Sequence, residues 1–236
     1  MIYFHHFHKS AGSAAVKHLS SKLTLPDNHV NGNMIDQNNH CIEFWNYDKN
    51  RLNSFLETFL ASGNTLLIAE WGIPNLELIK SYGFKTITII REPKERLWSN
   101  YCFDVSNKNY YGSLYNYIRN PVVPYSRRDY YNYEARQAIS KHYPVDQRTI
   151  SPLQYFLSGF DEIITLENGI FSKSKNNTSA LDFSLMPRSN VTKKSRLRSL
   201  IKKTPKLTTS EATHLENECE DDIQLYESIK KYTTRN

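Results

Sequence analysis

The sequence predicts an α/β protein in which a parallel sheet lies between two layers of helices. Apolar runs rich in β-branched and aromatic residues, at 2–7, 65–71 and 86–90, have the character of buried parallel strands. Segments with helical periodicity separate these runs, and such alternation gives a three-layer parallel sheet. A chain of 236 residues is long enough to bury a core of its own, so we expect a single domain over 1–236.

The first half of the chain supplies most of this alternation. The strand at 2–7 runs through a short turn of small residues into a helix expected at 12–23. Residues 26–40 are rich in Asn, Gly and Asp, which indicates an irregular, exposed segment. Apolar residues on one face predict a helix at 52–61, and a short helix is expected at 76–82 before the third strand.

The second half is expected to be mainly helical. Residues 97–145 are rich in tyrosine, and aromatic and basic side chains mix between Tyr125 and Arg136. That mixture suits sugar stacking with recognition of anions, and it suits a helix surface with local ion pairs equally well. A late strand is expected at 161–168. Apolar residues at helical spacing then predict an amphipathic helix in the tail, namely Leu215, Cys219, Ile223, Tyr226 and Ile229.

The turn after the first strand has the composition of an anion pocket. It reads Lys9-Ser10-Ala11-Gly12-Ser13 and leads into a helix, whose free N–H groups point at a ligand. Gly12 lets the chain approach closely, the two serines add hydroxyl donors, and Lys9 adds a mobile positive charge. We therefore expect a phosphate-binding loop, although it lacks the Walker A pattern. The alternative is an ordinary capped turn between a strand and a helix.

The strand at 86–90 ends in a second group of polar residues. Arg91 follows it directly, at the carboxyl end where open α/β sheets bind ligands. Pro93 suits the first turn of the next helix, and Ser99 lies two turns along it, where it could face the same crevice. Arg91 could instead form a salt bridge at the end of the strand.

Together the two segments resemble the sulfotransferases that use 3′-phosphoadenosine 5′-phosphosulfate (PAPS), in particular the carbohydrate, Golgi-type branch with its heparan- and chondroitin-type members. That family has a Lys-[Ser/Thr]-x-Gly-[Ser/Thr] loop after a strand. A later strand ends in Arg-[Asp/Glu]-Pro-x-x-Arg, with a serine in the helix that follows. Here these elements read Lys9 to Ser13 and Arg91 to Arg96 with Ser99. One departure is His8, where the family commonly has proline.

The resemblance implies a P-loop-like sulfotransferase fold. Animal members of this type carry an N-terminal membrane anchor, and because none is seen here we expect a bacterial or viral member, or a chain from which the anchor has been removed. The resemblance also implies transfer of a sulfuryl group from PAPS to a hydroxyl of a carbohydrate or glycolipid acceptor. Lys9 would stabilise the leaving phosphate, and the loop at 10–13 would hold the 5′-phosphate. Arg91 and Ser99 would hold the 3′-phosphate, which distinguishes PAPS from ATP. We expect no metal, because Lys9, Arg91 and the loop dipoles supply the positive charge.

Glu70 is the candidate base. Related enzymes carry a histidine or glutamate near the end of the strand that corresponds to 65–71. The apolar setting beside Trp71 is expected to raise the pKa of Glu70 toward the working pH. The alternative is that Glu70 pairs with Lys9 and has only a structural role.

Histidines and cysteines do not form a recognisable metal pattern. Alternation along the first strand places His6 and His8 on one face and His5 on the other, so packing or substrate contact is expected for them. The three cysteines are widely spaced and outside any zinc pattern, which indicates isolated thiols in a reducing compartment. They are Cys41, Cys102 and Cys219.

Charge and hydropathy limit the remaining classes. The net charge is +6, and basic residues crowd into 193–206, either as a solvated face or as an electropositive wall for a nucleotide or an anionic glycan. We expect no nucleic-acid partner. No stretch approaches the roughly 18 apolar residues of a membrane span, and no secretory signal is seen, so we expect a cytoplasmic protein.

Two other functions remain open. One is a small ATP-dependent kinase of the P-loop type, which is disfavoured by the missing Walker glycine and by the lack of an obvious magnesium-binding Asp after a strand. The other is a non-catalytic module that binds anionic polymers through the basic residues and tyrosines.

Overall fold

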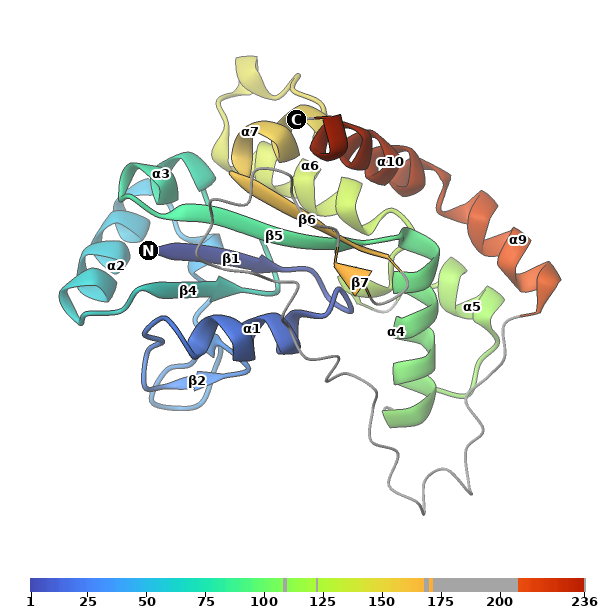
Figure 1. Ribbon diagram of the computed structural model, residues 1–236, viewed down its shortest axis with the longest axis horizontal. Helices are drawn as coiled ribbons and strands as arrows, with labels where there is room; N and C mark the ends of the chain where they lie inside the picture. The colour runs from blue at the N-terminus through green and yellow to red at the C-terminus, as the bar shows by residue number, and fades with distance from the viewer. Residues whose placement is uncertain (108–109, 122, 168–169, 172–207, 236) are drawn as a thin grey trace.

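The computed structural model describes residues 1–107, 110–121, 123–167, 170–171 and 208–235 (Figure 1). Its main sheet has the strand order β4-β1-β5-β6-β7. The first four of these strands are parallel, and β7 is antiparallel to β6. The strands are β1 (Ile2–His6), β4 (Leu66–Ala69), β5 (Lys85–Arg91), β6 (Glu162–Glu167) and β7 (Ile170–Phe171).

The helices alternate with the strands along the chain. Those of the first half are α1 (Gly12–Ser20), α2 (Lys49–Ala61), α3 (Leu76–Ser81) and α4 (Pro93–Asn107). Those of the second half are α5 (Leu114–Arg119), α6 (Tyr130–His142), α7 (Pro152–Gly159), α9 (Thr209–Glu218) and α10 (Glu220–Arg235). Three short 3-10 helices also lie within the described residues, at Phe44–Asn46, Pro124–Ser126 and Val145–Gln147.

Strand alternation divides the core between the two faces of the sheet. On one face, Phe4 and Ile87 pack with Leu19 of α1. On the other face, Tyr3 and Leu67 belong to a larger cluster with residues of α2, α3, α6, α7 and α10. Figure 1 shows α1 on the opposite side of the sheet from α6, α7 and α10. The predicted α/β class with a parallel sheet is confirmed, and helices on both faces are compatible with the three-layer arrangement.

Most predicted elements are present with shifted ends, and two segments differ in kind. Residues 26–40 hold a small antiparallel pair, β2 (His29–Val30) and β3 (Asn33–Met34), and Asn33 is buried. The tail forms two helices rather than one, because α9 ends at Glu218 and α10 begins at Glu220. The predicted apolar stripe is nevertheless correct, since its residues pack inward, with Ile223 partly exposed. The basic cluster at 193–206 lies outside the described residues.

No helix in the described ranges combines the length and the apolar character that crossing a membrane requires.

A buried arginine and a buried aspartate join α4, α6 and α10. Arg96 is fully buried and donates to the carbonyl oxygens of Tyr125 and Arg127, each at 2.8 Å. Asp222 of α10 is also fully buried, and it accepts from the backbone N–H of Tyr131 at the start of α6. The second arginine of the Arg91–Arg96 motif is therefore a structural residue that organises the backbone around the site.

Glu134 of α6 is a buried carboxyl group whose ionisation opposes folding. Burial raises its pKa to about 8 from an ordinary value near 4.5. Between these two values the folded protein holds a proton that the unfolded chain releases, so stability falls as the pH rises from about 4.5 to about 8. A shift of this size corresponds to a loss of up to about 5 kcal/mol.

We expect Glu134→Gln to remove this loss. Relative to wild type, the variant should gain stability at pH 8 and little at pH 5, as measured by urea unfolding at both pH values. Glu227→Gln, at an exposed position of α10, is the matched control and should show no pH-dependent difference. An equal effect of Glu134→Gln at both pH values would show that Glu134 is already ionised in the folded protein.

Candidate functional site

Three segments meet at the carboxyl edge of the parallel sheet. In the pairing register, His5 of β1 lies opposite Ala69 of β4, and His6 lies opposite Ile89 of β5. Because these strands are parallel, their ends come together at one edge (Figure 1). Glu70, the loop at 7–11 and Arg91 are thus neighbours in space although far apart in sequence.

The loop between β1 and α1 has an unusual backbone. Lys9 and Ala11 both have left-handed conformations, with φ of 63° and 61°. For residues other than glycine, this conformation costs on the order of 1–3 kcal/mol and is concentrated at functional sites. Ala11 is the N-cap of α1 and provides no side-chain cap. Within the described residues, the N–H groups of Gly12 and Ser13 have no hydrogen-bond acceptor, so they are available to an anion.

Gly12 is required because the His6 ring lies against it, as well as because of its place at the start of α1. A Cβ atom added at Gly12 would lie 1.7 Å from Cδ2 and Nε2 of His6. His6 is itself buried, so its ring cannot move aside freely. The sequence indicated a glycine that makes room for a ligand, and the structure adds that it makes room for His6.

Ser10 faces the core instead of the loop's outer side. It is fully buried, its N–H donates to the carbonyl of Phe7, and its Oγ lies 3.4 Å from the hydroxyl of Tyr131. The same Tyr131 hydroxyl accepts from Arg91 N at 2.9 Å and donates to Arg91 O at 2.8 Å. Ser10 and Tyr131 therefore join the loop to the end of β5, while the exposed Ser13 keeps the outward position that we expected of both serines.

Lys9 lies close to the acidic and imidazole groups of the site. Its Nζ is 3.2 Å from the centroid of the Phe103 ring on α4. Its positive charge acts to lower the pKa values of Glu70, His6 and His8. The lysine is thus placed between α4 and the end of β4, where it can stabilise a negative charge.

Arg91 contacts both the first turn of α4 and the loop after β1. Its Nε donates to Glu95 Oε2 at 3.1 Å, and its Nη1 makes a long contact of 3.5 Å with the carbonyl oxygen of Lys9. The strand-end salt bridge that we considered is therefore present, and the same arginine also reaches the loop. Ser99 lies one turn beyond Glu95 and one turn before Phe103, so it shares their face of α4.

Glu70 is a largely buried carboxyl group, with 13% of its side chain exposed. Its Oε2 accepts from Nδ2 of Asn33, at 3.2 Å. Burial raises the pKa of Glu70, while the Asn33 hydrogen bond and the charge of Lys9 act in the opposite direction. Its Oε1 lies 3.7 Å from Nδ1 of His6 and 3.9 Å from Nε2 of His8.

The two histidines beside Glu70 are neutral at physiological pH. Burial and the charge of Lys9 lower the pKa of His6 to about 4. Burial is also the main cause that lowers the pKa of His8 to about 3. The approaches to Glu70 are therefore polar contacts and not ion pairs. The predicted alternation of the first strand is confirmed, because His6 and His8 meet at Glu70 while His5 packs against Phe7 on the other face.

Sequence reasoning did not assign His8, Asn100 or Tyr131 to this site. His8 was noted as a departure from a family pattern and as a strand residue on the same face as His6, with packing or substrate contact expected, and its position beside the lysine was the further signal. Asn100 and Tyr131 stand 92 and 121 positions from their partners in the loop, so no local pattern could reveal them.

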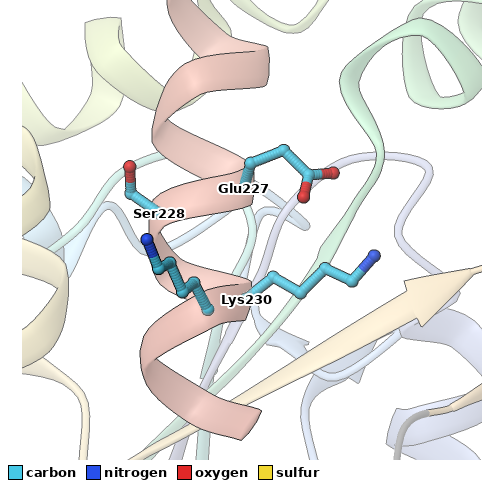
Figure 2. Close-up of a pocket in the computed structure, with 4 residues that line it drawn as sticks. Glu227, Ser228 and Lys230 are labelled. Atoms are coloured by element: carbon cyan, nitrogen blue, oxygen red, sulfur yellow. The ribbon is translucent and has the colours of Figure 1, made fainter. Parts of the chain in front are cut away.

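The rest of the described structure was searched for metal-binding groups and for hollows. In the described residues, no group of three His, Cys, Asp or Glu side chains is arranged to hold a metal ion. A surface hollow on the C-terminal half of α10 is shown in Figure 2, and its lining comes from that helix alone. The lining residues are Glu227, Ser228, Lys230 and Lys231.

No family model, no curated protein and no solved structure matches this chain.

Proposed function

We propose that this protein is a sulfotransferase that moves a sulfuryl group from PAPS to a hydroxyl of a carbohydrate or glycolipid. The observation that carries the proposal is the contact between Arg91 Nη1 and the carbonyl oxygen of Lys9. Through this contact, the two segments that resemble the family's donor motifs lie side by side at the ligand-binding edge of a parallel sheet. A base candidate, Glu70, lies at the same edge.

On the donor side, the loop and Lys9 carry the chemistry. The N–H groups of Gly12 and Ser13 and the hydroxyl of Ser13 hold the 5′-phosphate at the start of α1. Lys9 stabilises the charge that develops on the leaving phosphate as the sulfuryl group departs in line. The inward-facing Ser10 supports the loop from below through Tyr131.

Arg91 and Ser99 select the donor by its 3′-phosphate. A guanidinium fork can bind two phosphate oxygens, which gives both affinity and geometry. Nε of Arg91 is paired with Glu95, so a phosphate competes with this carboxylate for the guanidinium group. On the acceptor side, Glu70 is the carboxylate that favours loss of the hydroxyl proton.

This arrangement predicts opposite effects of two neighbouring substitutions. Arg91→Ala is expected to weaken binding of adenosine 3′,5′-bisphosphate (PAP) by about 100-fold, the worth of a bidentate charged contact. Glu95→Gln is expected to tighten PAP binding severalfold, because it removes the competing carboxylate. Isothermal titration calorimetry measures both. Arg148→Ala, at an exposed arginine beyond α6, is the control and should bind PAP as wild type does. Unchanged affinity in both site variants would remove Arg91 from the donor site.

The two alternative functions predict different binding behaviour. A small kinase would bind ATP with magnesium in preference to PAP. A polymer-binding module would show no nucleotide affinity and a steep salt dependence. The basic cluster on which the polymer alternative depends falls outside the described residues, so the structure adds nothing in its favour.

A further inference from the structure

His8 is held in a single orientation at the centre of the site. Its Nδ1 lies 2.7 Å from Oδ1 of Asn100, and its ring stacks on Tyr125 with the ring centroids 4.1 Å apart. Only 12% of the side chain is exposed. A ring packed on one face and hydrogen-bonded at one nitrogen can present its other nitrogen in only one direction.

The partners of Asn100 determine which nitrogen of His8 carries the proton. Nδ2 of Asn100 donates to the carbonyl oxygen of Tyr125 at 2.8 Å, and a carbonyl oxygen can only accept. The amide oxygen of Asn100 therefore faces His8, and this oxygen also can only accept. Nδ1 of His8 must donate, so in the neutral ring the lone pair is on Nε2.

That lone pair faces the acceptor side of the site. Nε2 of His8 lies 3.9 Å from Oε1 of Glu70, and a single oxygen atom placed between them can lie within hydrogen-bond distance of both. His8 also directly precedes Lys9, the residue on the leaving side. A hydroxyl group that approaches the sulfur opposite the leaving phosphate can therefore meet His8 and Glu70 together.

We propose that Nε2 of His8 accepts the proton of the incoming hydroxyl and that Glu70 stabilises the imidazolium formed. This inference rests on the proposed function and divides between two residues the role that the sequence assigned to Glu70. The hydroxyl oxygen forms the new bond to sulfur as its proton moves to Nε2. The bond from sulfur to the bridging oxygen breaks, and its electron pair leaves with the phosphate beside Lys9. Asn100 is a positioning residue that fixes the tautomer, as an orienting group does in catalytic triads.

The charges around His8 make its basicity depend on whether the donor is bound. Burial lowers the pKa of His8 to about 3, and the Asn100 hydrogen bond opposes this shift. The positive charges of Lys9 and Arg96 add to the lowering. A bound donor brings negative charge next to Lys9, which counteracts the effect of that lysine on His8. His8 is thus a stronger base when the donor is present than when the site is empty.

The test uses water as the acceptor, so that no sugar has to be identified first. Release of PAP from PAPS is measured under single-turnover conditions with His8→Ala, Glu70→Gln and wild type. His8→Ala is expected to be slower by at least about 100-fold, the usual contribution of a positioned base. Added imidazole should restore His8→Ala in proportion to its concentration, and it should not restore Glu70→Gln. His40→Ala, at an exposed histidine, should behave as wild type with and without imidazole.

Two controls separate this inference from the proposed function. His8→Ala should still bind PAP by calorimetry, since His8 is on the acceptor side. If wild type neither binds PAP nor releases it from PAPS, the proposed function fails. If wild type is active and His8→Ala is equally active, or is slow without rescue by imidazole, the role of His8 is overturned. Nitrogen-15 NMR of wild type gives a check without any substitution: the Nδ1–H tautomer of His8 is expected, and the Nε2–H tautomer would contradict it.

Discussion

Lys9→Ala is expected to slow the release of PAP from PAPS by at least about 100-fold, a loss of about 3 kcal/mol of transition-state stabilisation. Lys9 lies in the loop that leads into α1, and its charge lowers the pKa values of Glu70 and of both histidines beside it. A positive charge held there before reaction stabilises the leaving phosphate without reorganisation. Single-turnover measurement of PAP release at saturating PAPS gives the rate of the chemical step.

Two further variants separate the charge of Lys9 from its backbone. Lys9→Gly removes the same charge, so it should release PAP as slowly as Lys9→Ala. Because glycine relieves the left-handed strain at this position, the variant should be at least as stable to unfolding as wild type. Lys17→Ala, at an exposed lysine of α1, should keep wild-type turnover. Near-normal turnover in either Lys9 variant would rule out the assigned role of this lysine.

Asp222→Ala is expected to lower the free energy of unfolding by about 3 kcal/mol. Its buried carboxylate accepts from Tyr131 N at 2.9 Å, from Asn132 N at 3.0 Å and from Asn132 Nδ2 at 2.8 Å. Truncation leaves these donors buried and unsatisfied, at a cost of about 1–3 kcal/mol each before relaxation. Chemical denaturation monitored by circular dichroism measures the loss.

The same substitution should also weaken PAP binding in the fraction that remains folded. The backbone N–H of Tyr131 donates to Asp222, and the hydroxyl of Tyr131 donates to the carbonyl oxygen of Arg91. The tail helix α10 therefore supports the donor site through α6. Asp221→Ala is the matched control, because its side chain is exposed, and it should change neither stability nor PAP affinity. A wild-type unfolding free energy for Asp222→Ala would show that the N-terminus of α6 finds other acceptors.

The main strands and most helices were predictable from local patterns, whereas the β2–β3 pair and the break between α9 and α10 were not. The apolar runs at β1, β4 and β5 identify the strands, and Pro93 marks the first residue of α4 as expected. Because parallel strands end at a common edge, the sequence could also place Glu70, the loop and Arg91 near one another. These inferences need only periodicity and a rule of topology.

The partners within the site were not predictable, because they depend on packing between distant elements. The inward turn of Ser10 is set by Tyr131 of α6, and the tautomer of His8 is set by Asn100 of α4. The pairing of Arg91 with Glu95 depends on side-chain orientation at a strand-to-helix junction, where a phosphate ligand and a carboxylate are equally good partners for an arginine. Residue types alone do not distinguish these outcomes.

The central claim is that the site recognises a nucleotide by its 3′-phosphate. Calorimetric titration of the wild-type protein with PAP, ADP and ATP with magnesium tests it most directly. The proposed function predicts micromolar binding of PAP and much weaker binding of the two nucleotides that lack a 3′-phosphate. No binding of PAP, or equal binding of PAP and ADP, would contradict it and would leave the loop at 9–13 as a general phosphate-binding turn.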